Sequence, residues 1–292
     1  MTWRLEINHV TNYRYERPVV ASYNEARVTP LATPSQRVVE ADLSVSPRAE
    51  VFAYRDYWGA LVHAFDLHEP HDALVVTSSA VVETGLALTA GDGTAGDRDS
   101  RRPMTVRWED LRSAGTEDRF YEFLAPCPLV SPLDFAEVAE AIRAACAEPG
   151  QAVTETVEWA RSQLEYAGGS TSVTTTATQA WKGGRGVCQD FAQLTLGVLR
   201  AMGVPARYVS GYFYPKTTGA IGVQVAGESH AWVEVWTAGW TAYDPTNLVE
   251  VGERHIVVAR GRDYTDVAPL RGVYSGPAGS SAGVEVVLTR RA

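Results

Sequence analysis

The stretch that decides the fold is Gly183–Met202, GGRGVCQDFAQLTLGVLRAM. Six mostly apolar residues of this stretch recur at positions i, i+3, i+4, i+7, i+8 and i+11, which is the spacing of one helical face. These positions are Phe191, Leu194, Thr195, Val198, Leu199 and Met202. Gly203 closes the pattern and Pro205 prevents the helix from resuming. We therefore predict a helix with one buried face that begins at Cys188.

The position of Cys188 suits a nucleophile. The first backbone N–H groups of a helix have no intrahelical acceptor, and they stabilise negative charge such as that of a thiolate. The same groups could donate to an oxyanion while a tetrahedral intermediate forms. Gly183, Gly184 and Gly186 precede the cysteine and allow a substrate to approach the backbone closely.

A nucleophilic cysteine needs a base, and the base needs an orienting group. His230 opens a strand-like segment, HAWVEVW, and Asp244 closes the next one, WTAYD. With a turn near Thr237 to Gly239, the two segments form an antiparallel hairpin. Its first and last residues then lie next to each other at the open end. The spacing predicts that Asp244 reaches one nitrogen of His230 while the other faces Cys188.

The rest of the chain divides by pattern. Residues 1–90 carry short alternating or β-branched runs, among them 5–10, 39–45 and 74–83, separated by prolines, which predicts a small β-sandwich or antiparallel sheet domain. Residues 91–104 lie in a glycine-rich charged stretch and read as a linker. The remainder, 105–292, begins with two helical patterns, 133–147 and 153–166, that lead into the segment around Cys188.

Several segments together resemble the bacterial transglutaminase-like superfamily. In the core they are GVCQDFA at 186–192, GVPARYVSGY at 203–212, SHAWVEV at 229–235 and YDPTN at 243–247. In the front half they are INHVTNYRY at 7–15, PV at 18–19, YNEAR at 23–27, DYWG at 56–59 and PHDAL at 70–74, and near the end GRDYTDVAPLRG at 261–272. The resemblance spans nearly the whole chain. One departure is Gln193, where a histidine is common in the family.

The resemblance implies an α+β fold: an N-terminal β-sandwich-like domain, then a papain-like core with the nucleophile at a helix N-terminus packed on an antiparallel sheet. It further implies a cysteine protease or amidase that hydrolyses peptide or isopeptide bonds with Cys188, His230 and Asp244, without a cofactor. Transamidation, an acyltransferase like the arylamine N-acetyltransferases, and a catalytically inactive binding module stay open as alternatives.

Six further residues are candidates for the substrate cleft, each with a structural alternative. Tryptophans near the triad could line a cleft, although packing is their commoner role. An acid in the first turn of the helix could serve that helix electrostatically. The others lie in segments that match the family outside its core. The candidates are Trp181, Asp190, Trp232, Glu25, Tyr264 and Asp266.

Composition and sequence pattern exclude some classes of binding partner and location. The formal net charge of −9 disfavours nonspecific binding to nucleic acid or anionic lipid, and no segment is apolar enough to span a membrane. The N-terminus lacks the pattern of a secretory signal, and the three cysteines are too widely spaced for a disulfide framework. We therefore expect a cytoplasmic protein that acts on a peptide or amide substrate. The oligomeric state stays open.

The remaining cysteines and histidines have plainer interpretations. Cys127 and Cys146 fit packing positions. The spacing of His63, His68 and His71 is not a recognised ligand pattern, so no metal site is predicted. His9 and His255 lie beside apolar residues, which is typical of core or edge histidines.

Overall fold

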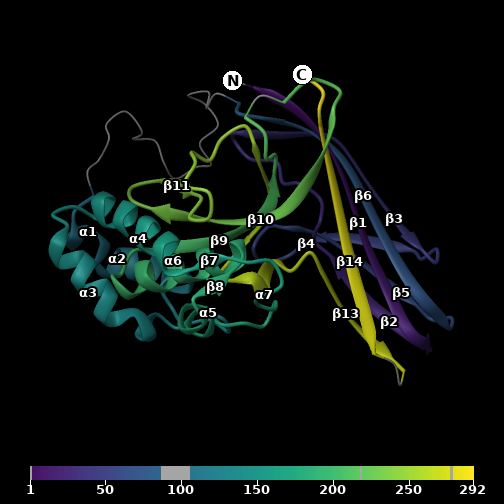
Figure 1. The fold of residues 1–292 in the computed structure, drawn as a ribbon, viewed down its shortest axis with the longest axis horizontal. Helices are drawn as coiled ribbons and strands as arrows, with labels where there is room; N and C mark the ends of the chain where they lie inside the picture. The colour runs from purple at the N-terminus through teal and green to yellow at the C-terminus, as the bar shows by residue number, and fades with distance from the viewer. Residues whose placement is uncertain (1, 87–105, 218, 277–278) are drawn as a thin grey trace.

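A computed structural model describes residues 2–86, 106–217, 219–276 and 279–292. Helices gather at one end of the molecule and long strands extend at the other (Figure 1). The strands are β1 (Trp3–Val19), β2 (Ala21–Ala26), β3 (Gln36–Ser46), β4 (Val51–Arg55), β5 (Leu61–Leu67), β6 (His71–Thr84), β7 (Glu165–Tyr166), β8 (Arg185–Gly186), β9 (Ala206–Phe213), β10 (Gln224–Trp236), β11 (Trp240–Tyr243), β12 (His255–Gly261), β13 (Leu270–Ser275) and β14 (Ser280–Arg290).

The helices follow the same order along the chain. They are α1 (Trp108–Leu111), α2 (Ala114–Arg119), α3 (Ala136–Ala145), α4 (Pro149–Gln163), α5 (Ala177–Gly183), α6 (Cys188–Ala201) and α7 (Tyr264–Val267), with short 3-10 turns η1 (Tyr121–Phe123) and η2 (Pro132–Phe135). The predicted helices and the two predicted strands of the hairpin are confirmed within a few residues, except that β10 begins six residues before His230. No helix in the described ranges is long and apolar enough to cross a membrane.

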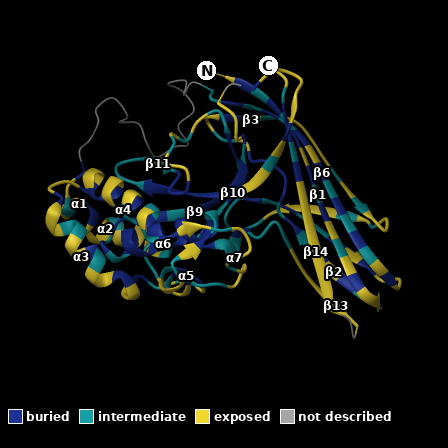
Figure 2. Ribbon diagram, in the orientation of Figure 1, coloured by how far each residue is buried: buried dark blue, intermediate teal, exposed yellow. Residues whose placement is uncertain are grey.

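The strand-rich end consists of two facing sheets. One contains β14, β1, β6 and β3, and the other has the order β13-β2-β5-β4. Apolar side chains from β1, β2, β5 and β6 meet in a core of their own, which includes Tyr15, Val19, Phe65, Leu67 and Leu74. Burial alternates along β6, as a strand with one face on a core requires (Figure 2). The expected sandwich-like N-terminal region is confirmed.

One antiparallel sheet joins this end to the helical end. Its order is β12-β9-β10-β14-β1-β6-β3, with β11 paired to β10. The first residues of β10, from Gln224 to Gly227, pair with β14, and Glu228 to Val235 pair with β9. The end of the chain thus returns to pair with its beginning, because β13 adds to β2 and β14 adds to β1. The predicted linker, 91–104, lies outside the described residues, and the domain boundaries at 90 and 105 stay predictions.

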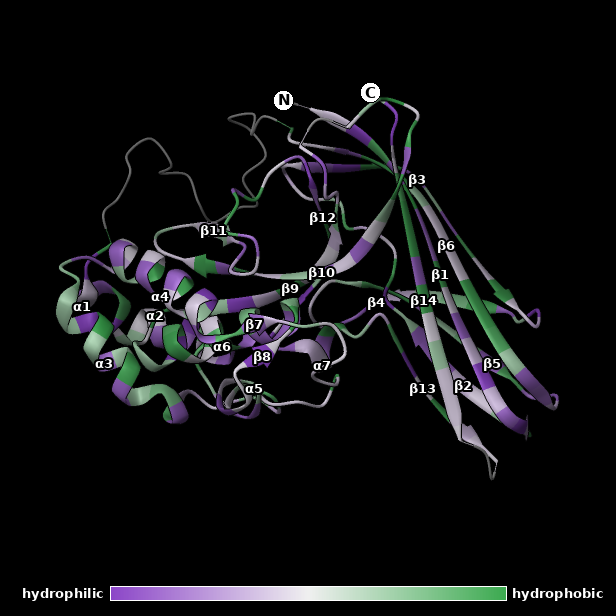
Figure 3. Cartoon of the chain, in the orientation of Figure 1, coloured by the Kyte–Doolittle hydropathy of each residue, from purple (hydrophilic) through white to green (hydrophobic). Residues whose placement is uncertain are grey.

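Helix α6 is buried on all sides, so the prediction of a single buried face is wrong. Every residue from Gln189 to Arg200 is buried. The helix packs on β9 and β10 and is covered by η2, α3, α4 and α5. In the hydropathy view, α6 nevertheless carries polar positions among apolar ones (Figure 3). The apolar periodicity predicted that the opposite face of this helix is exposed to solvent. Neighbouring helices cover that face instead, so its polar residues are buried.

The C-terminal strand provides a test of this continuous sheet. Leu288 on β14 is fully buried, and a Cβ on Gly227 of the neighbouring strand would lie 2.7 Å from it. We expect Leu288→Ala to lower the free energy of unfolding by about 2–5 kcal/mol, measured by urea denaturation. Val284→Ala on the same strand is the control, since Val284 is 60% exposed, and it should change stability by less than about 0.5 kcal/mol. Equal losses in both variants would contradict the placement of β14.

Candidate active site

The hairpin of β10 and β11 brings His230 and Asp244 together, as the sequence spacing predicts. Trp236 pairs with Trp240 across the turn, and Val233 pairs with Tyr243. His230 Nε2 lies 2.8 Å from Asp244 Oδ2. Both side chains are buried, with exposures of 5% and 2%. Because Nε2 is engaged by the carboxylate, Nδ1 is the nitrogen left for another partner.

Cys188 stands beside this pair at the first residue of α6. Its thiol lies 4.0 Å from the carbonyl oxygen of Ser229, the residue before His230. Burial by itself would lower the pKa of His230, but hydrogen bonds and charge interactions with Asp244 and Cys188 outweigh it and raise the pKa to about 9. An imidazole that favours its protonated form and lies between a carboxylate and a cysteine sulfur is the arrangement that a thiolate–imidazolium pair requires.

The carboxylate of Asp244 accepts hydrogen bonds at both oxygens. Oδ1 accepts from the backbone N–H groups of Thr246 and Asn247, at 3.0 and 3.1 Å. Oδ2 accepts from Asn247 Nδ2 at 2.9 Å, in addition to His230, and His255 Nε2 lies 3.3 Å away. Burial would raise the pKa of Asp244, but these donors hold it well below its usual range. The group is therefore a carboxylate at neutral pH.

His255 belongs to this site, although the sequence analysis predicted only a core or edge histidine there. It is buried, as predicted, but it also contacts Asp244 from β12, an element outside the hairpin. His9, by contrast, is a core histidine bonded to Tyr212 and Thr11 at 2.8 and 2.9 Å. No signal in the local pattern separates the two histidines, because only the sheet order brings β12 to the hairpin.

His230, Asp244 and His255 also form the group of possible metal ligands found among the described residues, with ligand atoms within 4.8 Å of one another. Their hydrogen bonds fit a metal poorly. The N–H of Gly252 is directed at His255 Nδ1 at 3.4 Å, and a neutral ring that accepts at Nδ1 carries its proton on Nε2, where it donates to Asp244 and leaves no lone pair for a metal. The pattern favours a network of hydrogen bonds.

The six predicted cleft residues lie in different surroundings. Asp190 is fully buried; its Oδ2 accepts from the N–H of Val187 at 2.8 Å and from Thr171 Oγ1 at 2.6 Å, which holds the loop before Cys188. Burial raises the pKa of Asp190, against these hydrogen bonds. Trp232 is fully buried next to His230, with ring centroids 6.0 Å apart.

None of the six is among the residues that line the cavity beside His230, and the other four have contacts of their own. The indole of Trp181 stacks on Phe135 and donates to Gln163 at 3.0 Å. Glu25 is on β2, where it pairs with Arg27 and accepts from Tyr54. Tyr264 and Asp266 are on α7, where Tyr264 packs against the core and Asp266 pairs with Arg262 at 2.9 Å.

A cavity of about 370 Å³ adjoins His230. Its lining residues are Arg161, Tyr166, Phe213, Pro215, Glu228, His230, Thr246 and Asn247. The pKa of Tyr166 is raised, first by burial and then by the charges of Glu228 and Cys188, so these groups share one neighbourhood. The sequence analysis named neither Arg161 nor Glu228, since neither lies in a recognisable motif.

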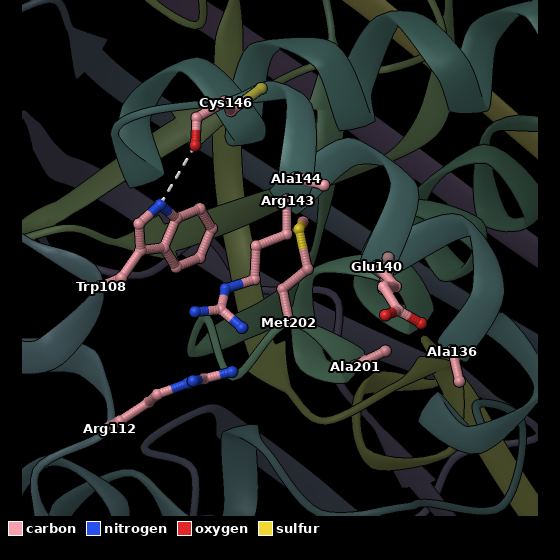
Figure 4. A pocket seen from close by; sticks show the side chains of 10 residues that line it. Trp108, Arg112, Ala136, Glu140, Arg143, Ala144, Cys146, Ala201 and Met202 are labelled. Carbon is pink, nitrogen blue, oxygen red and sulfur yellow. Dashed lines mark hydrogen bonds between the residues drawn. The ribbon is translucent and has the colours of Figure 1, made fainter.

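A second hollow, of about 500 Å³, lies at the other end of α6 (Figure 4). Trp108 and Arg143 line it, with the guanidinium 5.1 Å from the centre of the indole, and Trp108 Nε1 donates to the carbonyl of Cys146 at 3.3 Å. Met202 marks the end of the helix there, and 14 residues at 1.5 Å each separate it from Cys188 by about 20 Å. This hollow is not part of the site around His230.

Comparison with known proteins gives two family matches. Residues 5–83 match the bacterial transglutaminase-like N-terminal region, and residues 136–245 match the transglutaminase-like superfamily. An uncharacterised protein of Mycobacterium leprae is 46% identical over 99% of this chain and 100% of its own length. One of Mycobacterium tuberculosis is 34% identical over 93% of this chain and 88% of its own.

Two further similarities concern proteins whose names mention an activity. A cysteine protease candidate of Cytophaga hutchinsonii has the same fold, with a TM-score of 0.75, 21% identity, and coverage of 99% of this chain and 98% of its own. A protein-glutamine gamma-glutamyltransferase of Pseudomonas aeruginosa is 40% identical over 68 residues, which are 22% of this chain and 10% of that protein.

The raised pKa of His230 predicts how stability depends on pH. The folded state binds this proton more tightly than the unfolded chain, so the stabilisation is complete below about pH 6.5 and is lost as the pH rises through about 9. We expect the free energy of unfolding to fall by roughly 1–3 kcal/mol over this interval, measured by urea denaturation at several pH values. In His230→Gln this part of the decline should vanish. An identical decline in both proteins would show that His230 does not hold the extra proton.

Proposed function

Since the chain belongs to the transglutaminase-like superfamily, we propose that it is a cysteine-dependent hydrolase of amide bonds, in peptide or isopeptide substrates, with Cys188, His230 and Asp244 as its catalytic triad. The observation that carries the proposal is the buried 2.8 Å contact between His230 Nε2 and Asp244 Oδ2, with Cys188 at the start of α6 beside it. This arrangement supplies the nucleophile, the base and the orienting group that amide cleavage requires.

The reaction follows from which atoms are free. His230 Nδ1 takes the proton of the Cys188 thiol, and the thiolate attacks the carbonyl carbon of the substrate. The oxygen becomes an oxyanion, which the N–H groups at the start of α6 can stabilise. The intermediate then collapses: the carbon–nitrogen bond breaks, His230 returns its proton to the leaving amine, and a thioester remains. Water, deprotonated by His230, attacks the thioester and releases the carboxylic acid and the Cys188 thiol.

The cavity beside His230 is the proposed substrate cleft. It offers one cationic and one anionic side chain, Arg161 and Glu228, and a half-exposed aromatic ring, Tyr166. A peptide or amide of matching polarity fits such a site. We also propose, from the sequence, that the protein acts in the cytoplasm.

Acyl transfer to an amine is the second candidate. It shares every step up to the thioester and differs only in the acceptor, an amine in place of water. The short similarity to a protein-glutamine gamma-glutamyltransferase supports it. With a glutamine-containing peptide as substrate and excess primary amine present, mass spectrometry separates the two outcomes, because hydrolysis yields an acid and transfer yields a new amide.

The first test uses the thiol itself. We expect limiting iodoacetamide at about pH 6, well below the ordinary pKa of a free thiol, to alkylate the native protein once, at Cys188, and rapidly. Intact-mass analysis followed by peptide mapping measures this. Cys188→Ala should give no fast phase, and His230→Gln should slow it by orders of magnitude because the thiolate loses its imidazolium partner.

The other two cysteines serve as internal controls. Cys146 is buried, and burial raises the pKa of Cys127 to about 11 despite the nearby Arg200. Neither should react under these conditions. Slow alkylation that is equal in the native protein and in His230→Gln would remove the basis for a catalytic thiol and leave the inactive binding module as the better interpretation.

The charges of the cleft give a prediction that needs no known substrate. Iodoacetate carries a negative charge and iodoacetamide carries none, so the ratio of their rates at Cys188 reports the local potential. We expect Glu228→Gln to raise the iodoacetate-to-iodoacetamide ratio by about two- to fivefold and Arg161→Gln to lower it by a similar factor. Both shifts should shrink in high salt. Unchanged ratios in both variants would place these side chains outside the approach to Cys188.

A further inference from the structure

His255 contacts the orienting carboxylate from a strand that the triad does not use. It is the first residue of β12, and it is 4% exposed. Its Nε2 lies 3.3 Å from Asp244 Oδ2, the oxygen that also faces His230. The carboxylate therefore lies between two imidazole rings, one from the hairpin and one from the edge of the sheet.

The proton of His255 can be assigned from its other nitrogen. Nδ1 accepts the N–H of Gly252 at 3.4 Å, and a nitrogen that accepts carries no proton. In the neutral ring the proton is then on Nε2, which donates to Asp244. Burial lowers the pKa of His255; Asp244 opposes this effect, and the charges of His230 and Arg254 reinforce it. His255 is thus a neutral donor at physiological pH.

Two aromatic rings pack against the ring of His255. Phe213, its partner across the sheet, lies with its ring centroid 4.7 Å away, and Trp232 meets it edge-on at 5.3 Å. Trp232 can lie there because residue 211 is a glycine. A Cβ at Gly211 would come within 2.6 Å of the indole and 2.0 Å of the Ile256 carbonyl oxygen. The sheet therefore holds the donor of His255 in one direction.

We propose that His255 is a positioning residue: its Nε2–H fixes Oδ2 of Asp244 so that the carboxylate holds His230 with Nδ1 directed at Cys188. Asn247 donates to the same oxygen, but from a loop next to Asp244 itself, so it moves with the carboxylate. His255 ties Asp244 to a separate strand, β12. This role rests on the proposed function, because it acts through His230 on the thiol.

The functional test compares two replacements of His255. Phenylalanine keeps a ring of similar size without a donor, whereas glutamine places an amide N–H near the position of Nε2. We expect His255→Phe to slow the alkylation of Cys188 at about pH 6 by roughly tenfold or more, as misorientation of a catalytic group does, and His255→Gln to recover most of the rate. Circular dichroism and urea denaturation establish that both variants are folded.

The matched control is His9→Phe. His9 is equally buried and hydrogen-bonded but contacts Tyr212 and Thr11, so this variant should lose stability without slowing the alkylation. Equal rates in the native protein and in His255→Phe would overturn the proposal. So would a loss in His255→Phe that His255→Gln fails to recover, since that result would assign His255 a packing role only.

A second measurement does not depend on activity. The ring nitrogens of histidine report their protonation by ¹⁵N chemical shift, and His255→Gln identifies the signals. We expect His255 to hold its proton on Nε2 and to stay neutral between about pH 6 and 8. A proton on Nδ1, or titration in this range, would overturn the assignment. If the native thiol itself proves unreactive, the proposed function fails, while the ¹⁵N result still decides whether His255 donates to Asp244.

Discussion

The buried carboxylate of Asp244 is the constraint on which the site depends. It is 2% exposed and ionised, so each of its oxygens needs hydrogen-bond donors. The donors come from three places: His230 on β10, the turn that contains Thr246 and Asn247, and His255 on β12. Satisfying this one group therefore fixes the register of the hairpin, the path of the chain after β11 and the position of the edge strand relative to both.

Strand β10 connects the site around Asp244 to the rest of the molecule. Its second half carries His230 and pairs with β9, while its first four residues pair with β14, which in turn pairs with β1. The same sheet thus holds the site at one end and the strand-rich region at the other (Figure 1). Helix α6 lies on β9 and β10 and is enclosed by other helices from Gln189 onward, and this packing places the partly exposed Cys188 at its start beside the sheet.

The sequence predicted the parts of the structure that are local and missed those that depend on sheet order. The hairpin follows from a short turn between two strands, so the contact of His230 with Asp244 could be predicted from spacing alone, and the helix at Cys188 from its periodicity. Nothing local indicated that α6 is buried all round, because the helices that cover it pack from distant segments. Likewise, β14 and β12 find their partners through long-range pairing, which left His255 indistinguishable from His9. The alternation in 1–90 indicated the sandwich, but not that β13 and β14 complete its sheets.

Because His255 is neutral, a histidine suits this position better than a permanently charged side chain such as arginine. A buried ion pair gains stability only when its remaining hydrogen-bonding capacity is met, so Asp244 needs further donors besides His230. An arginine at this position would supply them, but its charge would compete for the carboxylate and disfavour the protonated state of His230. A neutral imidazole donates a hydrogen bond without a charge. It can hold the geometry of Asp244 while the negative charge remains available to the His230 imidazolium, whose raised pKa depends on it.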